Sequence, residues 1–139
     1  MKKIQWKKTL SVGIEPIDHQ HRQWIESFNN TVDAMTSRHS REQILKMLGF
    51  LVEYTETHFS TEERYMAENH YPGLQEQIQQ HQELRATLAN LVRDFEDEGI
   101  TPELTEAMDT FLGHWLIRHI KDLDMKFGAF TKRKKIDIS

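Results

Sequence analysis

The stretch NHYPGL, residues 69–74, interrupts a long amphipathic pattern and decides how the chain can fold. Proline and glycine end helices, and polar residues beside them favour a turn. On both sides of this break, apolar residues recur every three to four positions, which is typical of helices with one buried face. We therefore predict helices over residues 41–68 and 74–97. Because the connection between them is short, these two helices should lie antiparallel to each other.

The same periodicity predicts two further helices, over residues 16–38 and 102–130. Gly99 is suited to cap the third helix, and Thr101, Pro102 and Glu103 form a typical helix start. The apolar residues expected to face the core are Trp24, Ile25, Phe28, Val32, Met35, Ile44, Leu48, Leu51, Phe59, Met66, Leu74, Ile78, Leu84, Leu88, Leu91, Phe95, Leu104, Met108, Phe111, Trp115, Ile120, Leu123 and Phe127. The sequence thus predicts an all-α protein, an antiparallel up-down-up-down four-helix bundle in a single domain spanning residues 1–139.

The two ends of the chain are expected to lie outside the bundle of residues 16–130. Residues 1–15 should form an extended arm that packs Ile4, Trp6 and Leu10 onto the helices. Residues 131–139 should form a basic tail, because they contain the run KRKK at 132–135. Such a run is most often solvated surface rather than a lipid or nucleic-acid site.

Composition excludes several classes of function. The net charge of −4 argues against a general nucleic-acid binder. The chain has no cysteine, which rules out disulfides, thiolate metal sites and cysteine nucleophiles. No apolar stretch reaches the length of a membrane span, and the first residues lack the apolar core of a signal peptide. We therefore expect a cytoplasmic protein.

Polar residues interrupt the apolar stripes of all four predicted helices. The inward-facing ones are His21, His58, Glu62, His81, His119 and Asp124. Any one of them alone would most often be an ordinary buried residue with a hydrogen-bond partner. Together they are better explained by one metal centre, because imidazoles and carboxylates are ligands for iron, manganese or zinc and carboxylates can bridge two metals. The other four histidines, at 19, 39, 70 and 114, are expected at the surface or around the site.

Four motifs give the chain a resemblance to a known family. They are VGIEPIDHQH at 12–21, HFSTEERYM at 58–66, the YPGL turn at 71–74 that leads to His81, and HIKDLD at 119–124. In these motifs and their order the chain resembles the bacterial hemerythrins over nearly its whole length. The ferritin-like di-iron bundles use Glu-x-x-His pairs instead, and the inward residues of this sequence are not spaced that way.

The resemblance implies a non-haem di-iron centre, two iron ions with an oxo or hydroxo bridge, that binds O2 reversibly. By position, His21 and His58 would hold the iron with the open site, and His81 and His119 the other iron. Glu62 and Asp124 would bridge the two. The residues that would form a dry pocket wall on the O2 side are Trp24, Phe59, Trp115, Leu116 and Ile120.

One expected ligand position departs from the family pattern. The resemblance implies a second histidine on the third helix, four residues before His81, and this chain has Gln77 there. An amide oxygen is a poorer donor than imidazole. Gln77 either ligates weakly through that oxygen or leaves a position of the second iron open to water.

Two alternative functions stay open from the sequence. One is a di-iron oxidoreductase with peroxidase-like or nitric-oxide-handling activity, favoured by an open metal position beside Gln77. The other is a metal-poor helical interaction module in which the ligands are relics. Buried carboxylates without partners are destabilising, which disfavours the second alternative.

Overall fold

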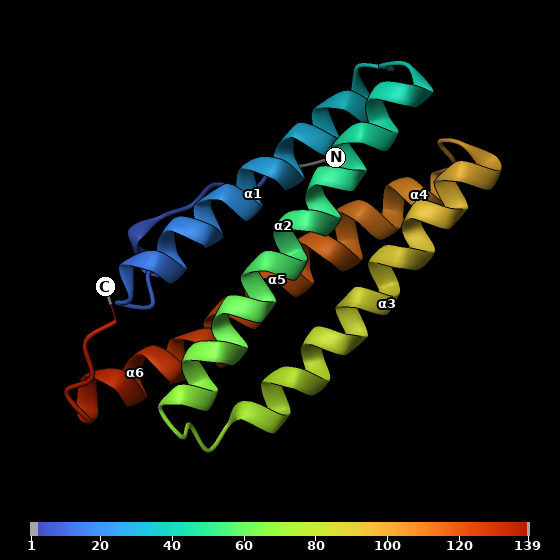
Figure 1. Ribbon diagram of the computed structural model, residues 1–139. Helices are drawn as coiled ribbons and strands as arrows, with labels where there is room; N and C mark the ends of the chain where they lie inside the picture. Colours follow the sequence, from blue (N-terminus) through green and yellow to red (C-terminus); the bar gives the residue numbers. More distant parts are fainter. Residues whose placement is uncertain (1–2, 139) are drawn as a thin grey trace.

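The computed structural model describes residues 3–138 and contains four antiparallel helical rods, as predicted (Figure 1). The first three rods are α1 (Glu15–Thr36), α2 (Arg41–Glu68) and α3 (Leu74–Glu98). The fourth rod is a series of five segments, α4 (Pro102–Glu106), η2 (Ala107–Leu112), α5 (Gly113–His119), η3 (Ile120–Asp124) and α6 (Met125–Arg133). The all-α, up-down-up-down bundle is confirmed.

The helix ends follow the local signals in the sequence. Ser40 and Gln43 form a capping box before α2, in which each side chain accepts a hydrogen bond from the other residue's backbone N–H at 3.2 Å. The break at 69–74 ends α2 and starts α3 at the predicted residues. Gly99 ends α3 with a φ of 72°, and the Thr101 hydroxyl accepts from the Leu104 N–H at 3.0 Å.

The fourth rod departs from a regular α-helix in two places. Residues Ala107–Leu112 and Ile120–Asp124 form π-helical segments, in which hydrogen bonds span one residue more than in an α-helix. The first segment therefore turns its side chains to directions that differ from those in a regular α-helix. The prediction that Phe111 faces the core was therefore wrong: Phe111 is 47% exposed, and its neighbour Leu112 is fully buried instead.

The N-terminal arm packs against the bundle as expected. Leu10 is buried in a short 3₁₀ turn, η1 (Lys8–Leu10), and Ile4 and Trp6 pack half-buried against the core. The Asn29 side chain holds the backbone of Ile4 by two hydrogen bonds, of 2.9 and 2.7 Å. The arm is thus fixed to α1 by polar as well as apolar contacts.

The predicted basic tail begins later than expected. The helix α6 continues to Arg133, so the first three residues of the range 131–139 are helical, and Thr131 is buried. The first two residues of the arm and Ser139 of the tail lie outside the described residues. Within residues 3–138, no helix has the length and apolar character needed to cross a bilayer.

At Gly128 of α6 the backbone of the arm passes close to the bundle. A Cβ at this position would overlap the carbonyl oxygen of Val12. We expect Gly128→Ala to lower the free energy of unfolding by about 1–3 kcal/mol, because the arm must move away. Urea unfolding of the metal-free protein measures this. The matched control is Gly49→Ala in α2, where a Cβ meets nothing within 4 Å and helix propensity favours alanine by about 0.5–1 kcal/mol. Equal shifts for both variants would contradict the prediction.

Candidate metal centre

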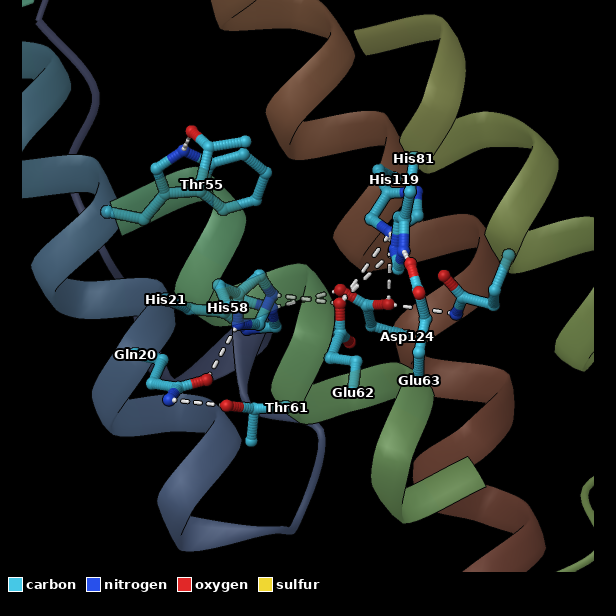
Figure 2. A network of polar contacts seen from close by, with 12 residues as sticks. Gln20, His21, Thr55, His58, Thr61, Glu62, Glu63, His81, His119 and Asp124 are labelled. Carbon is cyan, nitrogen blue, oxygen red and sulfur yellow. Dashed lines mark hydrogen bonds and ion pairs between the residues drawn. The ribbon is translucent and has the colours of Figure 1, made fainter. Parts of the chain in front are cut away.

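The six polar residues singled out from the sequence meet at the centre of the bundle (Figure 2). Each is at most 1% exposed: His21, His58, Glu62, His81, His119 and Asp124. The α2 pair is brought together by helix geometry, because residues four apart share a face. His21 comes from α1, His81 from α3, and His119 and Asp124 from the fourth rod, so the packing of the bundle is needed to assemble the set.

The π-helical segment η3 explains how His119 and Asp124 reach the same site. Residues five apart on an α-helix point in directions roughly 140° apart. In a π turn the hydrogen bonds join residues five apart, as between the Met125 N–H and the Ile120 carbonyl, so such residues lie about one turn apart. The His119 Nε2 and Asp124 Oδ1 atoms are consequently only 3.2 Å apart.

The ligand atoms form two groups with one member in common. One group holds His21, His58, Glu62 and Asp124, and the other holds Glu62, His81 and His119, with all ligand atoms of a group within 4.8 Å of one another. Figure 2 shows the two carboxylates between the His21/His58 pair and the His81/His119 pair.

Each carboxylate contacts imidazoles of both pairs. Glu62 Oε1 lies 2.9 Å from His58 Nε2 and 3.5 Å from His81 Nε2. Asp124 uses one oxygen for each pair, with Oδ2 at 2.9 Å from His21 Nε2 and Oδ1 at 3.2 Å from His119 Nε2. This is the placement that two bridging carboxylates require.

Several buried atoms of the site fit a bound cation. Both Glu62 oxygens and His58 Nε2 have no hydrogen-bond partner among residues 3–138, although Glu62 Oε1 and His58 Nε2 lie 2.9 Å apart. His58 Nδ1 faces the Gln20 amide oxygen at 3.0 Å, so Nδ1 carries the proton and Nε2 keeps its lone pair. A lone pair and a carboxylate oxygen this close need a proton or a metal ion between them.

The pKa values of the buried groups also fit a site for a bound cation. Burial lowers the pKa of His58 to about 4, which keeps this ring neutral at pH 7. Burial and the nearby Asp124 raise the pKa of Glu62. Burial opposes the charge on His119, but the Asp124 and Glu62 carboxylates together outweigh it and raise the pKa of His119 to about 10. The site thus holds a proton on His119 that a bound metal ion would replace.

Three of the histidines are oriented by a contact between Nδ1 and a side-chain oxygen from another rod. Besides the Gln20 contact with His58, Glu63 Oε2 lies 2.6 Å from His81 Nδ1, and Gln80 Oε1 lies 3.1 Å from His119 Nδ1. Each of these residues belongs to the rod that precedes its histidine in the chain. We call Gln20, Glu63 and Gln80 the outer acceptors.

The outer acceptors are not among the site residues predicted from the sequence. Each of them directly neighbours an inward-facing ligand, in the dipeptides QH at 20–21, EE at 62–63 and QH at 80–81. This adjacency in the sequence was the signal that could have identified them. Which histidine each one contacts depends on the packing of the rods.

Gln77 also lies inside the site and is 1% exposed. Its amide nitrogen donates to Asp124 Oδ1 at 3.0 Å, while its oxygen is buried without a hydrogen-bond partner in the described part of the chain. The amide therefore contacts one of the two central carboxylates and has an unused acceptor atom.

Aromatic and aliphatic residues enclose the polar centre. Phe59 stacks on His81 with ring centroids 3.8 Å apart, and Trp115 stacks on His119 at 4.6 Å. The ring centroids of Trp24 and His58 are 5.1 Å apart, and Trp24 donates its indole N–H to the Thr55 hydroxyl at 2.8 Å. The remaining predicted pocket residues, Leu116 and Ile120, are fully buried. Phe59 and Trp115 thus lie against the imidazoles of the second pair.

The remaining histidines do not contribute to the site. His19, His39, His70 and His114 are exposed, in line with the sequence analysis. In the range 3–138 the structure contains no further group of three or more side chains of metal-binding type beyond the two groups at the bundle centre.

Comparison with known proteins supports the same family as the motifs. The family model described as "Hemerythrin HHE cation binding domain" matches residues 12–130. The chain is 33% identical over 129 residues to bacteriohemerythrin of Stenotrophomonas maltophilia, covering 93% of this chain and 82% of that protein. It is 28% identical over 126 residues to myohemerythrin of Riftia pachyptila, covering 88% of each.

A solved structure has the same fold. The structure titled "Crystal structure of hemerythrin:wild-type" matches with a TM-score of 0.81 at 24% identity, covering 92% of this chain and 97% of that one. The family match spans nearly the whole bundle and includes all six candidate ligand positions. The chain therefore belongs to the hemerythrin family.

Proposed function

We propose that this protein is a non-haem di-iron protein that binds O2 reversibly. The observation that carries the proposal is the placement of the two carboxylates. Glu62 and Asp124 each contact imidazoles on both sides of the site, and both Glu62 oxygens are buried without a hydrogen bond within residues 3–138. Two metal ions would satisfy all of these atoms together.

The residues divide naturally between two iron ions. His21 and His58 would hold one, His81 and His119 the other, and Glu62 and Asp124 would lie between them. Ferrous iron at these positions would supply the electrons that O2 binding requires. The protein's own part is to present the imidazole Nε2 atoms inward, which the outer acceptors do for His58, His81 and His119 by holding Nδ1.

The apolar wall has a separate role. We assign the O2-side pocket to the predicted set of Trp24, Phe59, Trp115, Leu116 and Ile120. The rings of Trp24, Phe59 and Trp115 lie against imidazoles of the site, and Leu116 and Ile120 are fully buried. A wall of this kind keeps water from the bound gas, and exclusion of water slows side reactions. The cytoplasmic location expected from the sequence stays a prediction.

Iron content and optical spectra test the proposal directly. We expect two irons per chain after anaerobic loading with ferrous iron, because both carboxylates and four imidazoles are in place. Exposure to O2 should change the optical spectrum, and removal of O2 should restore it. Elemental analysis and spectra of one sample measure both. A single iron per chain would contradict the dinuclear site. Absence of iron would favour the interaction module, and sustained peroxide consumption would favour the oxidoreductase.

A further inference from the structure

Glu63 differs chemically from the other outer acceptors. Gln20 and Gln80 offer neutral amide oxygens to His58 and His119, at 3.0 and 3.1 Å. Glu63 offers a carboxylate to His81, at the shorter distance of 2.6 Å. Charge-assisted hydrogen bonds are shorter and stronger than neutral ones. Among the described residues, His81 is therefore the histidine whose Nδ1 has a carboxylate partner.

A network between α2 and α3 holds the Glu63 carboxylate in place. Arg85 Nη2 lies 3.4 Å from Glu63 Oε2, and its Nε donates to Glu56 Oε2 at 2.7 Å. The Arg85 guanidinium also lies over the Phe59 ring, 5.3 Å from its centroid, and Phe59 stacks on His81. The side chains of Arg85 and Glu63 are only 22% and 24% exposed. The carboxylate thus has a cation on one side and the His81 ring on the other.

The geometry makes Glu63 an outer partner of His81 and not a metal ligand. The carboxylate accepts from Nδ1, so Nδ1 carries the proton and Nε2 keeps a lone pair. That Nε2 faces the site, 3.1 Å from His119 Nε2 and 3.5 Å from Glu62 Oε1. Carboxylate–histidine–metal arrangements of this type fix the ring orientation and raise the basicity of the imidazole.

The contact between Glu63 and His81 belongs to the half of the site in which, by the resemblance, one imidazole is missing. His81 lies four residues after Gln77 on α3, and at position 77 the resemblance leads us to expect an imidazole where the chain offers a weaker amide. We propose that Glu63, held by Arg85, is a positioning residue that fixes His81 and strengthens metal binding by the group Glu62, His81 and His119. The inference rests on the proposed two-metal function and adds to it a residue that tunes one of the two metal positions.

A purely structural role for the same contacts makes different predictions. Ion pairs near the surface usually contribute little to stability. If the Arg85 ion pairs only held α2 against α3, their loss would affect unfolding but not metal affinity. Two measurements separate the roles. One is the affinity for zinc, a redox-inert probe, at each of two equivalents. The other is the ¹⁵N NMR signature of the His81 tautomer in the metal-free protein.

The test compares three variants of the full chain. Glu63→Gln keeps a hydrogen-bond acceptor without the charge, and Glu63→Ala removes the acceptor. Glu56→Gln is the matched control, because it alters a contact of Arg85 but touches neither His81 nor the metal ligands. Calorimetric titration with zinc should show the second equivalent weakened about 10–100-fold in Glu63→Ala. The effect in Glu63→Gln should be smaller, and Glu56→Gln should stay within about threefold of the original protein.

The NMR result should follow the same order. His81 should be the Nδ1–H tautomer in the original protein and a mixture of tautomers in Glu63→Ala. Unchanged zinc affinity and tautomer in both Glu63 variants would overturn the inference while leaving the proposed function intact. An equal loss of affinity in Glu56→Gln would also overturn it, because the effect would then come from the contact between α2 and α3. Failure of the original protein to bind a second zinc ion would instead count against the proposed function.

Discussion

Replacing Glu62 by glutamine should remove most of the iron, from two ions per chain to fewer than one after the same anaerobic loading. Glu62 belongs to both ligand groups, with contacts to His58 on one side and His81 on the other. The change therefore removes one negative charge from both metal positions at once. An amide oxygen is also a much weaker donor to iron than a carboxylate.

Stability measurements separate this loss of metal from a loss of folding. In the metal-free protein, Glu62 is a fully buried carboxyl whose pKa is raised by burial. A raised pKa means that the folded protein disfavours the ionised carboxylate at neutral pH, and glutamine has the same shape without the charge. We therefore expect the metal-free Glu62→Gln variant to be at least as stable toward urea as the original chain.

Trp115→Phe is the control for this experiment. It alters a ring that stacks on His119 without removing a ligand, so the variant should keep its iron and show only a changed spectrum. Full iron content and an unchanged spectrum in Glu62→Gln would show that the bridging assignment is wrong.

Restoring a histidine at position 77 should have the opposite effect on metal binding. Gln77 lies four residues before His81 on the same face of α3, and it is buried beside Asp124. An imidazole there is a stronger donor than the amide and fills the position that would otherwise admit water. We expect Gln77→His to bind iron about tenfold more tightly, equivalent to about 1.4 kcal/mol.

The same change should alter the chemistry with oxygen. With the position filled, the oxygenated protein should decay more slowly to the diferric form, and any peroxide turnover should fall. The measurements are autoxidation half-life and peroxide consumption at matched iron content. The control is Gln79→His, which adds a histidine at an exposed position of the same helix and should change neither.

Two outcomes would count against this reasoning. Equal half-lives and equal turnover in both proteins would mean that Gln77 already ligates as well as histidine, or that the second iron does not govern the reaction. A shorter half-life in Gln77→His would refute the argument that a filled position protects the oxygenated protein.

The sequence by itself determined the bundle and the inward direction of the main candidate ligands. The break at 69–74, the glycine at 99 and the helix start at Thr101 are local signals, and they place helix ends without knowledge of the rest of the fold. The inward stripe of each helix is also a local property, because it depends only on the helical period. His58 and Glu62 share a face for this reason, and the hydrophobic pattern around His81 points that ring inward.

The tertiary structure decided the features that depend on rotation and packing between rods. Phe111 is exposed because a π-helical segment shifts the register, and Asp124 reaches His119 because of a second such segment. Apolar periodicity assumes a regular α-helix, so it cannot anticipate either shift. The pairing of Glu63 with His81 was equally hidden, since the two residues are 18 positions apart and meet only where α2 packs on α3. Helical period fixes the direction of a side chain from its own axis, whereas its partner on another helix is fixed only once the helices pack.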